Sequence, residues 1–200
     1  MTRCWLIRHG EPVAEARGRC YGSMDFGLSQ NGRAEMALAA EYLKREPITA
    51  VYSSPLSRAR ESAGIVAMNR PLAVAVASDF RELNFGDFEG LTYEEIAARH
   101  PDAYREWMEA PTSVRFPNGD CFDELRVRVL ATFQNIVRER SGQTFAIVSH
   151  GGVNRVLLAW ALQIPDTCLF RLAQDYASVS LLTISDGRPG VSLLNYRHRR

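Results

Sequence analysis

Apolar and polar residues alternate along this chain with two periods, one typical of strands and one typical of helices. Four short apolar runs have the length and the β-branched or aromatic content of buried strands: residues 4–7, 48–52, 72–77 and 144–148. Two later runs, 179–184 and 191–196, flank a turn-forming segment at 186–190 and predict a hairpin. Strands that alternate with helices predict an α/β fold with a mostly parallel sheet.

The helices are predicted from apolar residues that recur at the helical period. They are expected over residues 29–45, 55–66, 93–99, 102–109, 121–140 and 153–162. Ser29 and Ser54 are expected to cap the first two, with Pro55 in the first helical position. Between the first predicted strand and the first helix, residues 11–28 form a polar, glycine-containing loop, and loops of that length in compact domains are usually functional.

Composition and charge narrow the function classes. The chain has 200 residues, 46% of them hydrophobic and 24% charged, and we expect a single globular domain over residues 1–200. A net charge of +1 provides no overall field for nucleic acid or an anionic membrane, so any anion must be bound locally.

Cellular location is predicted from the chain start and the cysteines. No secretory signal and no run of ~20 apolar residues is present, which favours a cytoplasmic protein with no membrane partner. The four cysteines lack CxxC spacing, which favours free thiols over a zinc site or disulfides.

Two predicted strands end in a histidine followed by glycine: His9 with Gly10, and His150 with Gly151. The carboxyl ends of strands line the ligand crevice of an open α/β sheet, so the two imidazoles are expected to converge. Gly151 would let backbone N–H groups approach an anion closely. Arg8 precedes the first histidine, and Arg58 is expected in the first turn of a helix at the same edge. The pattern predicts an anion pocket.

Such a pocket suits phosphoryl transfer. A neutral imidazole is a nucleophile toward phosphorus, and guanidinium groups neutralise the phosphoryl oxygens. Glu82, in the irregular segment 79–91, is placed to protonate the leaving oxygen and then to activate water.

Other interpretations of the same residues remain. Each histidine alone could be structural, Arg58 alone a surface residue, and Glu82 alone a loop carboxylate. Metal binding is disfavoured because HxH and HExxH spacings are absent, and a serine hydrolase because GxSxG is absent.

Four motifs, in order, match one known family. They are LIRHGE at residues 6–11, YSSPLSRA at 52–59, ELNFGDFEG at 82–90 and VSHGG at 148–152. Together they resemble the signature of the histidine phosphatase superfamily, also called phosphoglycerate mutase-like, over nearly the whole chain.

The resemblance implies roles for the same residues. His9 would be the phosphorylated nucleophile, with Arg8, Arg58 and His150 binding the phosphoryl group, and Glu82 would be the proton donor and then the base. It further implies a three-layer α/β/α sandwich with a mostly parallel six-stranded sheet, and neither a metal nor an organic cofactor. The expected partner is a small-molecule phosphate ester, and a homodimer is left open.

Three segments resemble one group within the superfamily, the α-ribazole phosphatases, which remove the 5′-phosphate of α-ribazole phosphate late in cobalamin assembly. These segments are residues 18–25, 116–122 and 170–178. Tyr21, in the first of them, is accordingly expected to contact substrate. Broad-specificity phosphatases of the superfamily share much of this pattern and remain the alternative, as does a phosphate-binding module without turnover.

Three positions depart from the family pattern. Pro12 and Glu15 stand where the first motif commonly has Ser or Thr and then Asn, and Cys121 replaces the usual Ser of its turn. A carboxylate at position 15 would repel a phosphate dianion, so Glu15 must face solvent or meet a cationic or hydroxyl-bearing part of the substrate.

Overall fold

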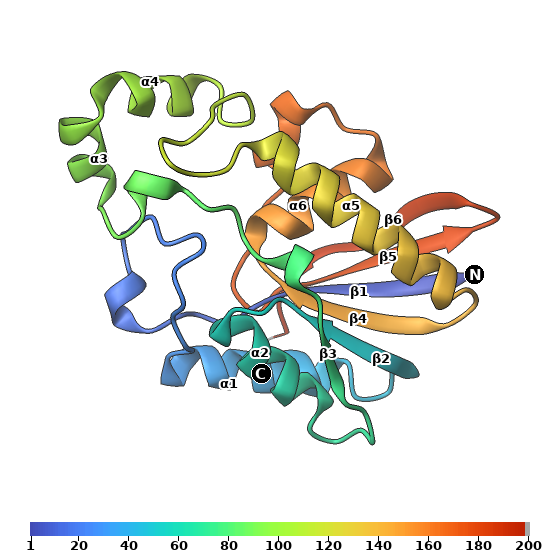
Figure 1. Cartoon of the computed structure of the whole chain (residues 1–200). Helices are drawn as coiled ribbons and strands as arrows, with labels where there is room; N and C mark the ends of the chain where they lie inside the picture. The colour runs from blue at the N-terminus through green and yellow to red at the C-terminus, as the bar shows by residue number, and fades with distance from the viewer. Residues whose placement is uncertain (199–200) are drawn as a thin grey trace.

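The sheet is the centre of the molecule, and its strand order places the predicted histidines side by side. A computed structural model describes residues 1–198, in which six strands follow the order β3-β2-β4-β1-β5-β6 (Figure 1). Their bounds are β1 Thr2–Arg8, β2 Ile48–Ser53, β3 Val74–Val76, β4 Thr144–Ser149, β5 Val179–Ser185 and β6 Arg188–Tyr196. The pairs β1–β4, β2–β4 and β2–β3 are parallel, whereas β5 is antiparallel to β1 and to β6. The predicted α/β fold with a mostly parallel, six-stranded sheet is confirmed, and the antiparallel β5 makes the sheet mixed.

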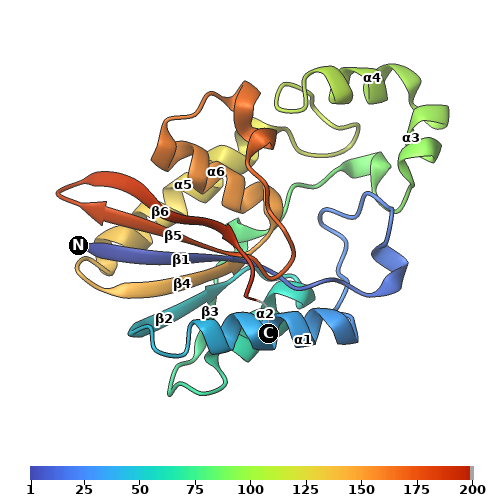
Figure 2. The ribbon, with the colours of Figure 1, turned by 180° about the vertical axis from the view of Figure 1, so that it is seen from behind.

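Helices cover both faces of this sheet (Figures 1 and 2). Helices α1 (Gln30–Tyr42) and α2 (Ser57–Ala67) lie on one face, and α5 (Phe122–Glu139) and α6 (Gly151–Leu162) lie on the other. Each face of the sheet has its own hydrophobic core, the first under α1 and α2 and the second under α5 and α6. Successive residues of a strand point to opposite faces, so Trp5 and Ile7 pack in the first core and Leu6 in the second.

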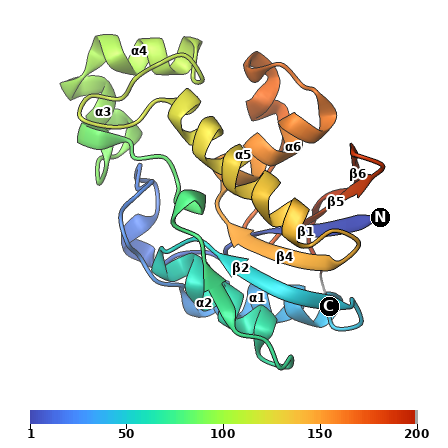
Figure 3. The ribbon, with the colours of Figure 1, turned by 45° about the vertical axis from the view of Figure 1, so that its right-hand side comes forward.

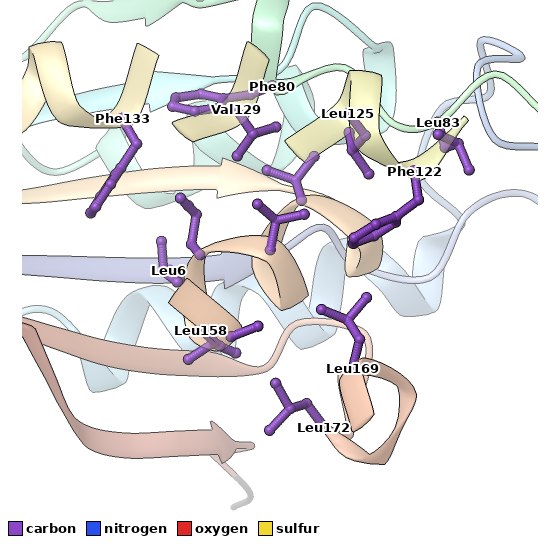
Figure 4. Close-up of a cluster of buried hydrophobic side chains, with 14 of the residues drawn as sticks. Leu6, Phe80, Leu83, Phe122, Leu125, Val129, Phe133, Leu158, Leu169 and Leu172 are labelled. Carbon is purple, nitrogen blue, oxygen red and sulfur yellow. The ribbon is translucent and has the colours of Figure 1, made fainter. Parts of the chain in front are cut away.

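The second core is dense and largely aliphatic (Figure 4). Leu6 of β1, Val129 and Phe133 of α5, and Leu158 of α6 are all completely buried there. Burying a side chain of this size stabilises a fold by about 1.5–3 kcal/mol. This packing fixes α5 and α6 on the sheet, and with them the start of α6, where the candidate site lies.

A cap of loops and two short helices lies beyond the carboxyl ends of the parallel strands (Figure 3). It consists of residues 11–28, residues 78–92, α3 (Tyr93–Arg99) and α4 (Pro101–Glu109). The first two segments are joined by backbone hydrogen bonds from Cys20 N to Leu91 O and from Gly90 N to Cys20 O. Segments far apart in sequence therefore form one wall over the sheet edge.

The start of α2 differs from the prediction. The helix begins at Ser57, with Leu56 as N-cap, so Ser54 does not cap it and Pro55 is not its first residue. The Asp25 carboxylate instead accepts the Ser57 backbone N–H at 2.6 Å and the Ser57 hydroxyl at 2.8 Å. The capping group comes from a distant loop, which local sequence pattern cannot reveal.

Other boundaries move by a few residues. Helix α6 begins at Gly151 rather than at 153, and α4 begins at Pro101, one residue earlier than expected. Strand β3, at the edge of the sheet, is confined to Val74–Val76 and is shorter than the predicted run 72–77. The hairpin turn is tighter than predicted, since Asp186 and Gly187 both have positive φ and β6 starts at Arg188.

Irregular segments also contain short 3-10 turns that no pattern predicted, at Ala14–Ala16, Ser78–Phe80, Gly86–Phe88 and Asp166–Arg171. Over residues 1–198, none of the helices combines the length and the apolar character that crossing a membrane requires.

Candidate active site

His9 directly follows β1, and its side chain is buried. Its Nδ1 lies 2.8 Å from the carbonyl oxygen of Gly10. Because a carbonyl only accepts, Nδ1 carries the hydrogen in this contact and Nε2 is left with its lone pair. Burial lowers the pKa of His9 well below its ordinary value, and the charges of Arg58 and Arg8 lower it further. His9 is therefore a neutral imidazole with a free nucleophilic nitrogen.

His150 directly follows β4, the neighbouring parallel strand, and is the N-cap residue of α6. Its ring centroid lies 5.1 Å from that of His9, so the two imidazoles converge as predicted. Its Nε2 lies 2.6 Å from Ser54 Oγ, and the same hydroxyl accepts the Leu56 N–H at 3.3 Å, ahead of the first residue of α2. Burial first, and then the charge of Arg58, hold the pKa of His150 well below its usual range.

Arg58 is completely buried, and its guanidinium is anchored by backbone carbonyls. Nη1 donates to Met24 O at 2.6 Å and Nη2 to Gly22 O at 2.5 Å. Arg8 donates from Nη1 to Gln174 O, and its guanidinium carbon lies 4.1 Å from the centroid of the Tyr176 ring. The interpretation of Arg58 as a surface residue is wrong.

Neither arginine is neutralised within the described part of the chain. No carboxylate of residues 1–198 lies within 4.0 Å of Arg8 or Arg58. Arg8 Nε, Arg58 Nε and His150 Nδ1 are buried and lack a hydrogen-bond partner among those residues. Buried positive charge and unpaired donors are costly unless a ligand satisfies them. A bound anion would neutralise the charge of the arginines and accept hydrogen bonds from the unpaired donors.

Glu82 is held at the start of α6. Its Oε2 accepts the Gly152 backbone N–H at 3.0 Å, and its Oε1 accepts the Leu83 N–H at 3.0 Å. A Cβ atom at position 152 would lie 2.4 Å from Glu82 Oε1. Gly152 is therefore required for this approach, a reason that the motif alone did not give.

Tyr21 and Gly151 also lie at the site. The Tyr21 hydroxyl is 2.8 Å from that of Tyr176, and the Tyr21 ring centroid lies 5.0 Å from the Arg58 guanidinium carbon. Burial raises the pKa of Tyr21, which keeps its hydroxyl neutral. A Cβ at Gly151 would lie 3.0 Å from Arg155 Nη1 and 3.6 Å from Arg8 Nε.

These residues surround one cavity of about 230 Å³. Arg8, His9, Tyr21, Arg58, Glu82 and Gly151 line it, and His150 is buried against His9 without lining it. The opposite wall is aromatic, built by Phe85, Tyr93, Trp107, Phe116, Phe122 and Phe170. Within residues 1–198 no three His, Cys, Asp or Glu side chains form a metal-ligand group, and the cations of the cavity are arginines.

Sequence reasoning missed several residues of the site. Arg155 lines the cavity and donates from Nε to Leu172 O at 2.9 Å; it follows Gly151 by one helical turn, and that spacing could have indicated it. Tyr176 and the aromatic wall carried no local signal.

Two of the positions that depart from the family pattern are now placed. Glu15 lies exposed in the turn Ala14–Ala16, so of the two alternatives for its carboxylate the structure has the one that faces solvent. Pro12 is buried in a β-bridge with Leu28.

Comparison with known proteins finds relatives over nearly the whole chain. The family model described as histidine phosphatase superfamily (branch 1) matches residues 4–197. The bifunctional protein Rv2228c of Mycobacterium tuberculosis is 38% identical over 196 residues, which are 97% of this chain and 54% of that protein. The chain therefore spans about half the length of this relative.

Two further matches extend over almost the full length of both proteins. Phosphoserine phosphatase 1 of Hydrogenobacter thermophilus is 29% identical over 195 residues, or 98% of this chain and 92% of that protein. The crystal structure of the alpha-ribazole phosphatase from Shigella flexneri matches with a TM-score of 0.89 and 27% identity, and covers 99% of this chain and 98% of that one.

Proposed function

This chain belongs to the histidine phosphatase superfamily, and from that premise we propose that it is a metal-independent phosphomonoesterase that works through a phosphohistidine at His9. The observation that carries the proposal is the uncompensated charge of the buried Arg58 and the half-buried Arg8 beside a neutral imidazole. Phosphatases among its relatives support the same reaction class.

In the first step, His9 Nε2 attacks phosphorus in line with the ester oxygen. The N–P bond forms as the P–O bond breaks, and the leaving oxygen takes a proton from Glu82. Arg8, Arg58 and His150 hold the phosphoryl oxygens, where fixed positive charge and N–H donors stabilise the transition state.

In the second step, water attacks the phosphohistidine. Glu82, now a carboxylate, accepts a proton from that water as the new O–P bond forms, and the N–P bond breaks to release inorganic phosphate and neutral His9. One carboxyl group serves as acid and then as base. Its hydrogen bond to Gly152 at the start of α6 keeps it beside the same phosphorus in both steps.

For the substrate we propose α-ribazole 5′-phosphate, whose aromatic base is joined to ribose. The aromatic wall supports this choice, since Tyr93 stacks on Trp107 at 5.6 Å and Phe170 is half exposed at the cavity. A small polar ester such as phosphoserine would leave that wall uncovered. The alternative is a broad-specificity phosphatase of small esters.

The proposal also covers the architecture, the cellular location and the partners of the enzyme. Helices on both faces of the sheet support the three-layer α/β/α sandwich, within one domain. The free cysteines Cys4, Cys20, Cys121 and Cys168 support a reducing cytoplasm. The partner we propose is one small phosphate ester, with no nucleic acid and no membrane, and a homodimer is compatible with it.

Phosphate release tests the proposal. We would compare α-ribazole 5′-phosphate with p-nitrophenyl phosphate, phosphoserine and 3-phosphoglycerate in EDTA, with His9→Ala as control. A strong preference for the ribazole ester that is lost in the variant supports the full proposal. Comparable slow release from all four supports the generalist. No release, together with stabilisation by vanadate, contradicts an enzyme and indicates a binding module.

A further inference from the structure

Glu82 lies on a segment with little regular structure of its own. Only the 3-10 turn Ser78–Phe80 precedes it, and residues 81–85 belong to no helix or strand. A general acid must nevertheless be held within a fraction of an ångström of its target, because a displacement of about 1 Å can cost about 10²-fold in rate. Groups outside the segment must therefore fix its backbone.

Arg128, on the helix α5, makes that connection. Its Nη1 donates to the carbonyls of Asp79 and Arg81, and its Nη2 donates to the carbonyl of Glu82 itself at 3.2 Å. One guanidinium thus binds three carbonyls within four residues. Its side chain is only 20% exposed, and its bonds to Asp79 O and to Glu82 O are partly buried, which shelters them from competing water.

The far side of Glu82 is held through the same arginine. Asp120 Oδ2 accepts the Asn84 backbone N–H at 3.1 Å and lies 3.9 Å from Arg128 Nη2. The Asp120 N–H in turn donates to Asn84 O at 2.9 Å. Backbone groups before and after Glu82 are therefore connected to a single side chain on a helix packed against the sheet.

From this arrangement we infer that Arg128 is a positioning residue for the acid–base carboxyl, a role that rests on the proposed function. Arg128 does not line the cavity and touches neither His9 nor the phosphate-binding arginines. It acts by setting the place of the Glu82 backbone. A lysine cannot replace it fully, because one ammonium lacks the planar fork that reaches three carbonyls.

Positioning of an acid has a kinetic signature that simple destabilisation lacks. An alkyl phosphate has a strongly basic leaving oxygen that needs the proton from Glu82, whereas p-nitrophenolate leaves readily without it. Loss of general acid catalysis should therefore lower kcat/KM for an alkyl ester by about 10²-fold, with a far smaller effect on the aryl ester. Both esters share His9 and the phosphate-binding residues.

The experiment measures kcat/KM for an alkyl phosphate and for p-nitrophenyl phosphate in Arg128→Met and Arg128→Lys. Glu82→Gln is the positive control for a lost acid. Arg126→Met is the matched control, since Arg126 lies on the same helix and, among residues 1–198, its ion-pair partners are the exposed Asp123 and Asp166.

We expect Arg128→Met to reproduce the leaving-group discrimination of Glu82→Gln, Arg128→Lys to show part of it, and Arg126→Met to show none. If Arg128→Met does not fold, the ratio of kcat/KM for the two esters in Arg128→Lys decides the question. Equal losses for both esters in the folded Arg128 variants, or no loss, would overturn the positioning role. Absence of discrimination in Glu82→Gln would instead contradict the acid role in the proposed function.

Discussion

The two halves of the site are held by different kinds of structure. His9 and His150 extend directly from paired parallel strands, and the β1–β4 ladder in register from Arg3 to Arg8 fixes their separation. Glu82 belongs to the cap, and so do Phe85, Tyr93 and Trp107 of the aromatic wall, while its other rings come from segments beside the cap. The loops there are fixed by side chains such as Arg128 and Asp25. The nucleophile half is thus set by the sheet, and the acid and substrate half by individual long-range contacts.

This difference predicts how each half responds to substitution. A change in the strand half should remove turnover of every ester, because all esters share the phosphoryl group. A change in the cap should separate one ester from another. Three substitutions and one pH dependence test the distinction, and the loss on substitution of Arg58 should be the largest.

Arg58→Met should produce the largest loss. It removes one guanidinium that faces the phosphoryl oxygens, and one such donor contributes about 10²–10³ in rate. Arg58 is completely buried and has no carboxylate partner within residues 1–198, so relief of its buried charge should offset part of the loss of its hydrogen bonds to Met24 O and Gly22 O. The free energy of unfolding should therefore fall by less than the transition-state stabilisation does. Steady-state kinetics on two esters, with urea unfolding as the companion measurement, check both points. Unchanged activity would remove Arg58 from the site.

Gly152→Ala should cost about 10²-fold through Glu82. The new Cβ would lie 2.4 Å from Oε1, so the carboxylate must move. The matched control is Gly64→Ala in the helix α2, where a Cβ meets nothing within 4 Å; it should keep full activity and gain roughly 0.5–1 kcal/mol of stability. Equal kcat/KM in the two alanine variants would contradict the placement of Glu82.

Phe170→Ala should raise the KM of the ribazole ester by about tenfold, since an aromatic contact contributes about 0.5–1.5 kcal/mol. Phe170 is 52% exposed, so its removal should leave folding intact. Inhibition by inorganic phosphate, which occupies only the strand half, should not change. Leu194→Ala, at a similarly exposed position on β6, is the control. An equal rise in the inhibition constant of inorganic phosphate would contradict the claim that Phe170 acts on the base of the substrate and not on its phosphate.

The pH dependence of stability should show the buried histidines. Both have pKa values below the ordinary value of about 6.5, so the unfolded chain binds their protons first as pH falls. Stability should therefore decrease below about pH 6.5, by up to about 1.4 kcal/mol per pH unit for each histidine. His150→Asn should reduce this slope by about one proton in urea unfolding between pH 7.5 and 5.5. An unchanged slope would contradict the lowered pKa of His150.

The strand half was predictable from the sequence, and most of the cap was not. His9 and His150 follow apolar runs whose strand character can be read locally, and their glycine neighbours indicated an anion. Ser54 was wrongly predicted as a cap because α2 begins only at Ser57, whose N–H is accepted by Asp25 from a distant loop. Arg128 and Tyr176 gave no local signal, since their partners come from other segments. The local sequence pattern predicts strands and helices, but it does not predict which distant side chain caps a helix or contacts a site residue.

The central claim is that phosphate passes through His9. Rapid quenching of the enzyme with a phosphorus-labelled ester should trap protein-bound phosphate that is labile in acid and stable in alkali, approaching one per chain and mapping to His9 by mass spectrometry. His9→Ala should trap none and release none. Full turnover without labelled protein, or a label on any other residue, would contradict the account.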